Sequence, residues 1–429
     1  MARIVLATFG SYGDLFPYIA IARRLRDLGH ESILAGPANY RGFVEGLGVG
    51  FAPLRPEVDF SDVETMRRIM DAKSGGRYVR SKILAPRIRE TYADLEVACD
   101  GADVLTSHSL TYAAPILGEV RGLPWLSTVL TPMMFGSVHQ PPALSALPAW
   151  AKMRVFGPRI TGLVWRAILR ASWSWSEPIR AFRAELGLDP NVDPLFEGQH
   201  SPRGCLALFS REFAEPQPDW PIRTTVCGWP FLDVDFASGG GEGELEAFLA
   251  AGPPPLAFCL GSAAVHAAGD FYELAAGAAR ALGRRAVLVH GNVPVPFEST
   301  DDLLLLRSIN VSSLFVGAEL VVHAGGVGTT GQVMRAGKPQ LVVPFAHDHF
   351  DNGVTLGRLG IGESIPRTSL NARSLRTALE RLLNDEGVRE RAVTVGARVA
   401  AEDGADAAAR AILELVPQMG NPSESPHSS

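Results

Sequence analysis

The chain has 429 residues, of which 46% are apolar and 20% charged, a composition typical of a globular α/β protein that excludes a largely disordered chain. Its length favours two domains of roughly 200 residues over a single core. The formal net charge of −6 argues against a general nucleic-acid binder, so we expect no nucleic-acid partner.

Strand and helix patterns alternate from the N-terminus. The β-branched run at residues 3–9 reaches a glycine-rich turn, residues 15–30 carry apolar side chains at helical spacing, and residues 31–36 are typical of a strand. This order predicts a βαβ unit and therefore a parallel sheet. The same order returns in a strand, a helix and a strand at residues 102–107, 112–122 and 124–130.

A second series follows the Gly/Pro-rich stretch at residues 227–255. Strands are predicted at residues 255–262, 285–291, 319–326 and 339–345, and helices at residues 271–283 and 330–337. The fold class is therefore α/β, with two doubly wound halves. The predicted parts are an N-terminal domain (1–215), a linker (216–240), a C-terminal domain (241–404), a helix (405–418) that could pack against either half, and a disordered, polar tail (419–429).

One glycine-rich turn lies where a strand ends and a helix begins, in "VVHAGGVGTT". Missing side chains let phosphate oxygens approach the backbone, and the helix N-terminus favours their charge. His323, Thr329 and Thr330 could donate hydrogen bonds to those oxygens. Gly261 and Ser262 in "CLGSAA" repeat the arrangement. Such a turn alone is weak evidence, and the specific signal is its combination with "PFAHDHFDN" one strand later.

The segment from "HAGGVGTTGQVMRAGKP" to "HDHFDNGVTLGRLGIG" resembles the donor-binding signature of GT-B glycosyltransferases of the UDP-glycosyltransferase superfamily, and "GSYGDLFPYIAIARRLRDLGHES" is similar to their N-terminal signature. "GSAAVHAAGDFY" and "TPMMFGSVHQPPAL" are similar to the bacterial branch with rhamnolipid rhamnosyltransferases and antibiotic and sterol glycosyltransferases. The resemblance implies two Rossmann-like domains facing each other across a cleft, with the acceptor mainly on the first and the donor mainly on the second. It also implies inversion at the anomeric carbon, with no metal and no cofactor besides the nucleotide-sugar donor.

The resemblance implies roles for individual residues. Asp348 and His349 occupy the family's sugar-reading Asp-Gln pair, and His349 departs from it because an imidazole is shorter than a glutamine side chain and titratable. Asn352 would brace the turn, and Gln332 would face the ribose. Ser308 stands where many relatives stack an aromatic ring on the base, so the sequence does not decide between uracil and thymine. The full donor-binding set is Gly261, Ser262, Val311, His323, Gly325, Gly326, Gly328, Thr329, Thr330, Gln332, Asp348 and His349, and the acceptor-binding set is Gly13, Phe135 and His139.

An inverting transfer needs a general base for the acceptor hydroxyl. Asp14 is the only titratable side chain in the turn "GSYGD", where the resemblance places the base. A helix cap is the structural alternative for Asp14. His108, in "DVLTSHSL", matches the position that orients the base in relatives. We therefore expect a dyad with Asp14 as base and His108 holding it, while His108 as the base, acting through Asp14 or a water, remains the alternative.

The predicted function is transfer of a hexose, of the glucose or rhamnose type, from a UDP- or dTDP-sugar to a hydroxyl of a hydrophobic small molecule or lipid. The alternatives are a nucleotide-sugar epimerase of the same fold and a non-catalytic partner protein. "DVD" at residues 233–235 imitates a metal-binding motif, and we expect no metal there.

Three further features of the sequence indicate where in the cell the protein is located. Scattered cysteines and an N-terminus unlike a signal peptide predict a cytoplasmic protein. Residues 143–176 lack acidic side chains and carry four of the seven tryptophans. This segment predicts an amphipathic helix that covers the acceptor cleft or docks peripherally on the inner face of the membrane. The sequence leaves the oligomeric state open.

Overall fold

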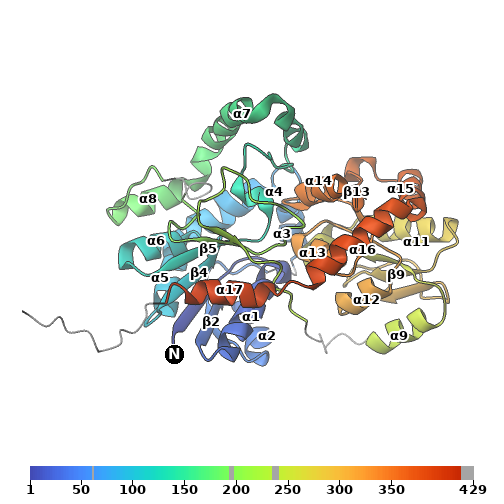
Figure 1. Cartoon of the computed structure of the whole chain (residues 1–429), viewed down its shortest axis with the longest axis horizontal. Coiled ribbons are helices and arrows are strands. Elements are labelled where there is room, and N and C mark those ends of the chain that lie inside the picture. The colour runs from blue at the N-terminus through green and yellow to red at the C-terminus, as the bar shows by residue number, and fades with distance from the viewer. Residues whose placement is uncertain (60–61, 193–197, 234–240, 417–429) are drawn as a thin grey trace, which may run out of the picture.

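The computed structural model describes residues 1–59, 62–192, 198–233 and 241–416, and contains two α/β halves side by side (Figure 1). Each half has a parallel sheet with helices packed on it, as the alternating strand and helix patterns predict. The strands are short apolar runs because both faces of a parallel sheet are buried.

The first sheet has seven strands in the order β3-β2-β1-β4-β5-β6-β7. They are β1 (Arg3–Ala7), β2 (Glu31–Gly36), β3 (Gly50–Pro53), β4 (Val104–His108), β5 (Trp125–Val129), β6 (Cys205–Ala207) and β7 (Thr224–Val226). Strand β7 pairs with β6 in parallel. The first sheet therefore extends beyond residue 215 into the segment predicted as linker. The sequence does not predict this edge strand because three residues are too few to show a pattern.

The second sheet has six strands in the order β10-β9-β8-β11-β12-β13. They are β8 (Leu256–Cys259), β9 (Ala286–Val289), β10 (Leu303–Leu306), β11 (Leu320–His323), β12 (Gln340–Val342) and β13 (Gly362–Ser364).

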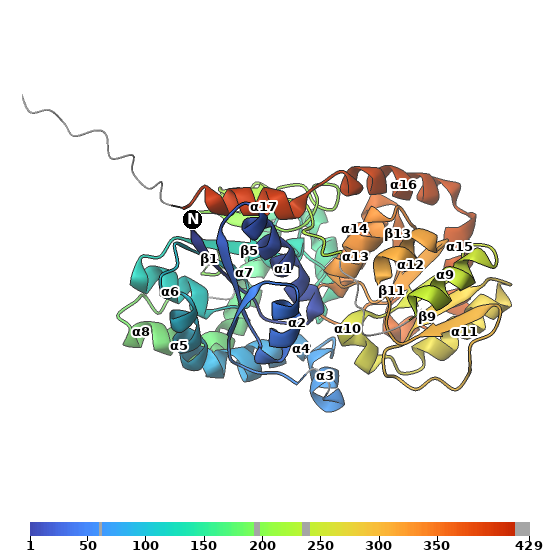
Figure 2. The ribbon, with the colours of Figure 1, turned by 90° about the horizontal axis from the view of Figure 1, so that it is seen from below.

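The helices lie between and beside these strands (Figures 1 and 2). Those of the first half are α1 (Tyr12–Asp27), α2 (Arg41–Gly46), α3 (Val63–Ile69), α4 (Gly75–Tyr78), α5 (Ile88–Ala98), α6 (Ala113–Arg121), α7 (Gly157–Ser172) and α8 (Glu177–Glu185). Those of the second half are α9 (Glu242–Ala250), α10 (Gly261–Ala264), α11 (Phe271–Ala281), α12 (Val311–Gly317), α13 (Val327–Arg335), α14 (His349–Leu359), α15 (Ala372–Asn384) and α16 (Glu386–Ala400).

The last helix, α17 (Gly404–Leu413), crosses back to the first half. It lies along α1 (Figure 2), and Arg24 pairs with Asp406 at 2.6 Å. The C-terminal helix therefore packs against the first half. The predicted disordered tail lies outside the described residues.

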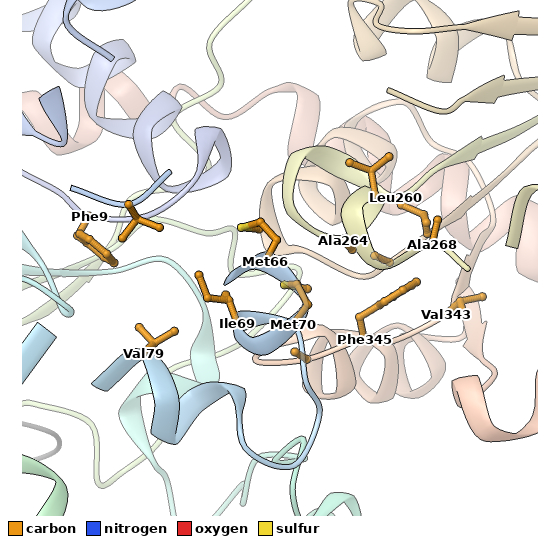
Figure 3. Packing of buried hydrophobic residues seen from close by; sticks show 14 of the residues in the cluster. Phe9, Met66, Ile69, Met70, Val79, Leu260, Ala264, Ala268, Val343 and Phe345 are labelled. Atoms are coloured by element: carbon orange, nitrogen blue, oxygen red, sulfur yellow. The ribbon is translucent and has the colours of Figure 1, made fainter. Parts of the chain in front are cut away.

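Apolar side chains also join the two halves. Met66 and Met70, at and just beyond α3, lie beside Ala264 and Phe345 of the second half, whereas Ile69 points back into the first half (Figure 3), and all five are buried in one cluster. This contact brings the segment around α3 against the short helix that follows β8. The two halves are thereby held face to face.

Each sheet reverses its strand order next to its first strand. The reversals fall between β1 and β4 and between β8 and β11. In open parallel sheets, ligands bind beyond the carboxyl ends of the strands at this point. Asp14 follows β1 and His108 ends β4, and the glycine-rich turns at Gly261 and Gly325 follow β8 and β11.

Candidate active site

Asp14 lies in the first turn of α1, which begins at Tyr12, earlier than the apolar pattern predicts. Ser11 is the N-cap residue, and its backbone N–H donates to Asp14 Oδ2 at 2.8 Å while its hydroxyl donates at 3.3 Å. These bonds fix the carboxylate against the turn after β1. Asp14 is therefore not the N-cap residue considered above but the third residue of the helix, and the capping-box bond from the Ser11 N–H orients its side chain.

His108 ends β4 directly beside Asp14. Its Nδ1 accepts a hydrogen bond from the Leu110 N–H at 3.4 Å, which assigns the ring proton to Nε2. Nε2 lies 4.0 Å from Asp14 Oδ1, so the two side chains are neighbours rather than a bonded pair. In this tautomer His108 presents a donor to Asp14, which leaves the carboxylate as the proton acceptor of the two.

The surroundings change the charge of both groups. Although 33% of the Asp14 side chain remains accessible, burial among the two halves raises the pKa of Asp14 to about 7. The charge of Asp348 acts in the same direction, and the bonds from Ser11 act against it. Burial lowers the pKa of His108 to about 4, so the imidazole is neutral at pH 7. A carboxyl with a pKa near 7 is well matched to general base catalysis.

The N-terminus of α13 lies opposite the N-terminus of α1 in the other half. A Cβ added to Gly328 would lie 4.0 Å from Gly13 Cα, so the two helix N-termini approach closely through residues without side chains. Gly13, which is predicted on the acceptor side, and Gly328, which is predicted on the donor side, therefore face each other. Two partial positive charges from helix N-termini thus face the same space, which favours a ligand with negative charge.

Asp348 lies at the N-terminus of α13 as well as of α14. Its Oδ2 accepts hydrogen bonds from the Val327 N–H at 3.2 Å and from Asn352 Nδ2 at 2.7 Å. Asn352 also donates to the Gly325 carbonyl oxygen at 2.7 Å, so it braces the turn as predicted. Burial raises the pKa of Asp348.

The role predicted for His323 is not what its geometry supports. The side chain is fully buried, its Nε2 lies 2.8 Å from Gln340 Oε1, and its Nδ1 accepts from the Gly325 N–H at 3.1 Å. The ring proton on Nε2 is therefore donated to Gln340, and none is left for a phosphate oxygen. His323 positions the turn at Gly325, because the neighbouring strand β12 supplies a partner that the sequence alone could not reveal.

His349 presents the free N–H that His323 lacks. Its Nδ1 accepts from the Phe345 N–H at 3.4 Å, which leaves the proton on Nε2. A Cβ added to Gly326 would lie 3.7 Å from Nε2, so this nitrogen lies against the glycine-rich turn. Burial lowers the pKa of His349 to about 4, so the ring is a neutral donor at pH 7.

We expect His349→Ala to weaken binding of UDP or dTDP roughly tenfold, the scale of one lost hydrogen bond to a charged oxygen. His349→Gln should restore most of the affinity because an amide also donates. Calorimetric titration of both variants measures this. Equal affinity of His349→Ala and the wild-type protein would show that Nε2 does not contact the donor.

Two contacts cross the cleft beside this site. Asp351 Oδ1 accepts from the Ala143 N–H of the first half at 2.8 Å, and Thr131 Oγ1 lies 3.3 Å from Asn352 Oδ1. Burial raises the pKa of Asp351 to about 6. The first turn of α14, which follows Asp348, is therefore bonded to the backbone of the first half.

The other predicted donor residues differ in their surroundings. Gly261 has a φ of +75°, and a Cβ there would lie 3.8 Å from Thr329 Oγ1, so both turns meet. Ser262 is exposed, whereas Thr330 is fully buried. Val311 is the first residue of α12. The Gln332 side-chain oxygen accepts from Arg335 at 2.9 Å, so ribose binding would require it to exchange this partner.

The predicted acceptor residues differ in their surroundings. The Phe135 ring stacks on Trp220 with centroids 4.1 Å apart, which makes it part of an aromatic cluster, while the His139 side chain is exposed. Asp233 of the metal-like motif pairs with Arg335 at 2.5 Å. Among the described residues, no three His, Cys, Asp or Glu side chains are grouped as metal ligands would be.

Three positions at the site were not identified from the sequence. Ser11 holds Asp14, and the spacing of Ser11 and Asp14, a capping-box pattern, could have shown this. Gly10 has a φ of +138°, and a Cβ there would lie 2.2 Å from Asp14 Oδ2. His347 adopts a left-handed φ of +53°, and its local sequence carries no signal for this conformation.

Comparison with known proteins agrees with this arrangement. Residues 4–139 match the glycosyltransferase family 28 N-terminal domain, and residues 298–415 match the erythromycin biosynthesis protein CIII-like C-terminal domain. O-mycaminosyltylonolide 6-deoxyallosyltransferase from Streptomyces fradiae is 34% identical over 427 residues, covering 96% of this chain and 97% of the relative.

Solved structures share the fold. The glycosyltransferase of kitacinnamycin superposes with a TM-score of 0.72 at 21% identity, covering 97% of this chain and 99% of that one. Spinosyn rhamnosyltransferase SpnG complexed with thymidine diphosphate has a TM-score of 0.67 at 18% identity, covering 96% and 100%. The identity to the Streptomyces fradiae enzyme over nearly the full length of both chains sets aside the epimerase and the non-catalytic partner. The chain belongs to the GT-B glycosyltransferases of the UDP-glycosyltransferase superfamily, and it is a sugar-transferring enzyme that uses a nucleotide-sugar donor.

Proposed function

We propose that this glycosyltransferase moves a hexose, with inversion and without a metal, from a UDP- or dTDP-sugar to a hydroxyl of a hydrophobic natural product or lipid. The observation that carries the proposal is the placement of Asp14. Its carboxylate lies beside His108 at the reversal point of the first sheet. The N-terminus of α13, with Asp348, faces it across the cleft.

In the proposed reaction, Asp14 takes the proton of the acceptor hydroxyl as its oxygen bonds to the anomeric carbon. The bond from that carbon to the diphosphate oxygen breaks on the opposite face, which inverts the configuration. His108 would donate from Nε2 to Asp14 and keep the carboxylate oriented. The proton on Asp14 then passes to solvent when the product leaves.

The departing diphosphate gains negative charge, and the chain's own groups would stabilise it. The first N–H of α13, at Val327, is bonded to Asp348. A helix N-terminus leaves the next N–H groups without intrahelical partners as well, and these would bind the diphosphate. His349 Nε2–H adds a donor beside Gly326. These groups support departure without a metal ion, as the resemblance implies.

Two relatives favour a particular donor and acceptor. The Streptomyces fradiae relative is named for moving a 6-deoxyallosyl group to O-mycaminosyltylonolide, and SpnG was solved with thymidine diphosphate. We therefore place a dTDP-6-deoxyhexose and a natural-product aglycone first among the candidate substrates. UDP-glucose and a lipid acceptor are next.

Calorimetric titration with UDP and dTDP, in the presence of EDTA, tests the donor site. We expect binding of at least one nucleotide diphosphate without metal, with dTDP tighter than UDP. The tighter one then selects the donor, UDP-glucose or dTDP-rhamnose, for an acceptor screen with product detection by mass spectrometry. Absence of binding to both, or binding only when Mg²⁺ replaces EDTA, would contradict the proposal.

A further inference from the structure

Helix α7 stands apart from the rest of the first half (Figure 1). Of its sixteen residues, Gly157–Ser172, only Thr161 and Ser172 are buried. A helix this exposed gains little from packing, and most helices in globular proteins bury an apolar stripe. Its exposed side chains therefore need a separate explanation. No helix in the described part of the chain is long and apolar enough to cross a membrane.

The inner face of α7 is attached to the acceptor side of the cleft. Thr161 Oγ1 donates to the Val138 carbonyl oxygen at 2.7 Å. A Cβ on Gly136 would lie 2.5 Å from the Trp165 ring, so this ring packs directly on the backbone between Phe135 and His139. A partner that binds α7 would therefore lie close to the predicted acceptor residues as well.

Three exposed apolar side chains lie on α7 and on the residue before it. Phe156 is 57% exposed, Ile160 46% and Leu163 62%. Their spacing of four and three residues puts them on one side of the helix. Single exposed apolar side chains are ordinary, but three adjacent ones beside a projecting helix mark an interaction surface.

Three arginines border these apolar side chains. Arg159, Arg166 and Arg170 are exposed, and their spacing of seven and four residues puts them on one strip of the helix. Within the described residues, none of them takes part in an ion pair with a carboxylate. Residues 143–176 contain no acidic residue, although the whole chain has a net charge of −6. This local positive charge is complementary to an anionic partner.

We propose that the α7 outer face, formed by Phe156, Ile160, Leu163, Arg159, Arg166 and Arg170, docks on an anionic lipid surface. An apolar stripe next to a basic strip is the arrangement by which a helix lies in the plane of a membrane, with its apolar side chains among the acyl chains and its arginines at the headgroups. A nucleic acid would attract the arginines but leave the apolar residues exposed. Docking would bring the acceptor residues next to α7 to the surface in which a hydrophobic acceptor dissolves; this last step rests on the proposed function, whereas membrane binding does not.

Vesicle co-sedimentation of the full chain tests the inference without any enzymatic step. Vesicles of phosphatidylcholine with about one third phosphatidylglycerol should bind the protein, and vesicles of pure phosphatidylcholine should bind it much less. Arg159→Gln, Arg166→Gln and Arg170→Gln together should weaken binding about 100-fold, at about fivefold for each arginine. Leu163→Asp should also weaken binding by removing the inserted side chain, and raised salt should weaken it further.

Matched controls separate local effects from general ones. Arg23→Gln, Arg67→Gln and Arg373→Gln change the net charge equally at exposed positions elsewhere, and Ile222→Asp alters an aliphatic side chain that is fully exposed. We expect both controls to bind like the wild-type protein.

Equal loss in the controls, or no binding of the wild-type protein, would overturn the inference. A wild-type dimer in solution that Leu163→Asp dissociates, without vesicle binding, would overturn it in favour of a second copy. Donor titration of every variant shows separately whether the proposed function holds.

Discussion

The Asp14→Asn variant is expected to bind the nucleotide diphosphate as the wild-type protein does and to turn over about 100 times more slowly, or slower still. The amide has the same shape and its oxygen can still accept from Ser11, so the first turn of α1 keeps its geometry. It cannot take a proton from the acceptor hydroxyl. Single-turnover rates with saturating donor and acceptor measure the loss in the chemical step.

The pH dependence should report the same carboxyl. Because burial raises the pKa of Asp14 to about 7, the base form is populated above that pH and lost below it. We expect kcat/KM to fall tenfold per pH unit below about 7 and to level off above it. A profile that levels off near pH 5 would instead indicate the imidazole of His108, whose pKa burial lowers to about 4.

Two variants control the assignment of the base. Asp27→Asn alters an exposed aspartate at the last residue of the same helix and should leave turnover unchanged. His108→Gln should lower turnover less than Asp14→Asn does, because His108 acts through Asp14. Near-normal turnover of Asp14→Asn together with an inactive His108→Gln would transfer the role of base to His108.

The parts of this site that follow a strand could be predicted from the sequence. Apolar runs that end in a glycine-rich turn fix both the strand and the position at which its ligand-facing residues begin. The turns at Gly261 and Gly325, and Asp14 after β1, lie where that rule places them. The proximity of Asp14 and His108 follows in part from the same rule, because β1 and β4 are neighbours in the sheet.

Partners that come from another strand or from the other half could not be predicted. The glycine-rich turn predicts that His323 donates to phosphate, whereas Gln340 on the adjacent strand takes its proton. The contact of Asp351 with Ala143 depends on how the halves face each other. Strand β7 and the apolar contact made by the segment at α3 are likewise products of tertiary packing, which overrides weak local patterns.

The Gly325→Ala variant should show how closely the donor site depends on backbone contact. Gly325 has a φ of +98°, and a Cβ there would lie 2.7 Å from Val342 Cγ1 and 2.9 Å from the His349 carbonyl oxygen. Backbone cannot swing aside as a flexible side chain can, so α14 must shift away from the turn. We expect a loss of stability of about 3 kcal/mol from strain and overpacking combined, or roughly 6–12 °C in Tm for a domain of this size.

The same shift should also abolish donor binding. The start of α14 lies in contact with Gly325. This contact allows Asp348 to accept from the first N–H of α13 and places His349 against Gly326. Gly328→Ala is the matched control for stability: its Cβ would meet only Gly13 Cα, at 4.0 Å, so its Tm should stay near that of the wild-type protein. Calorimetric titration with dTDP and UDP should detect neither nucleotide with Gly325→Ala at temperatures where the variant is folded. Wild-type affinity in a folded but destabilised Gly325→Ala protein would show that the donor is held independently of the start of α14, and the roles proposed for Asp348 and His349 would then fail together.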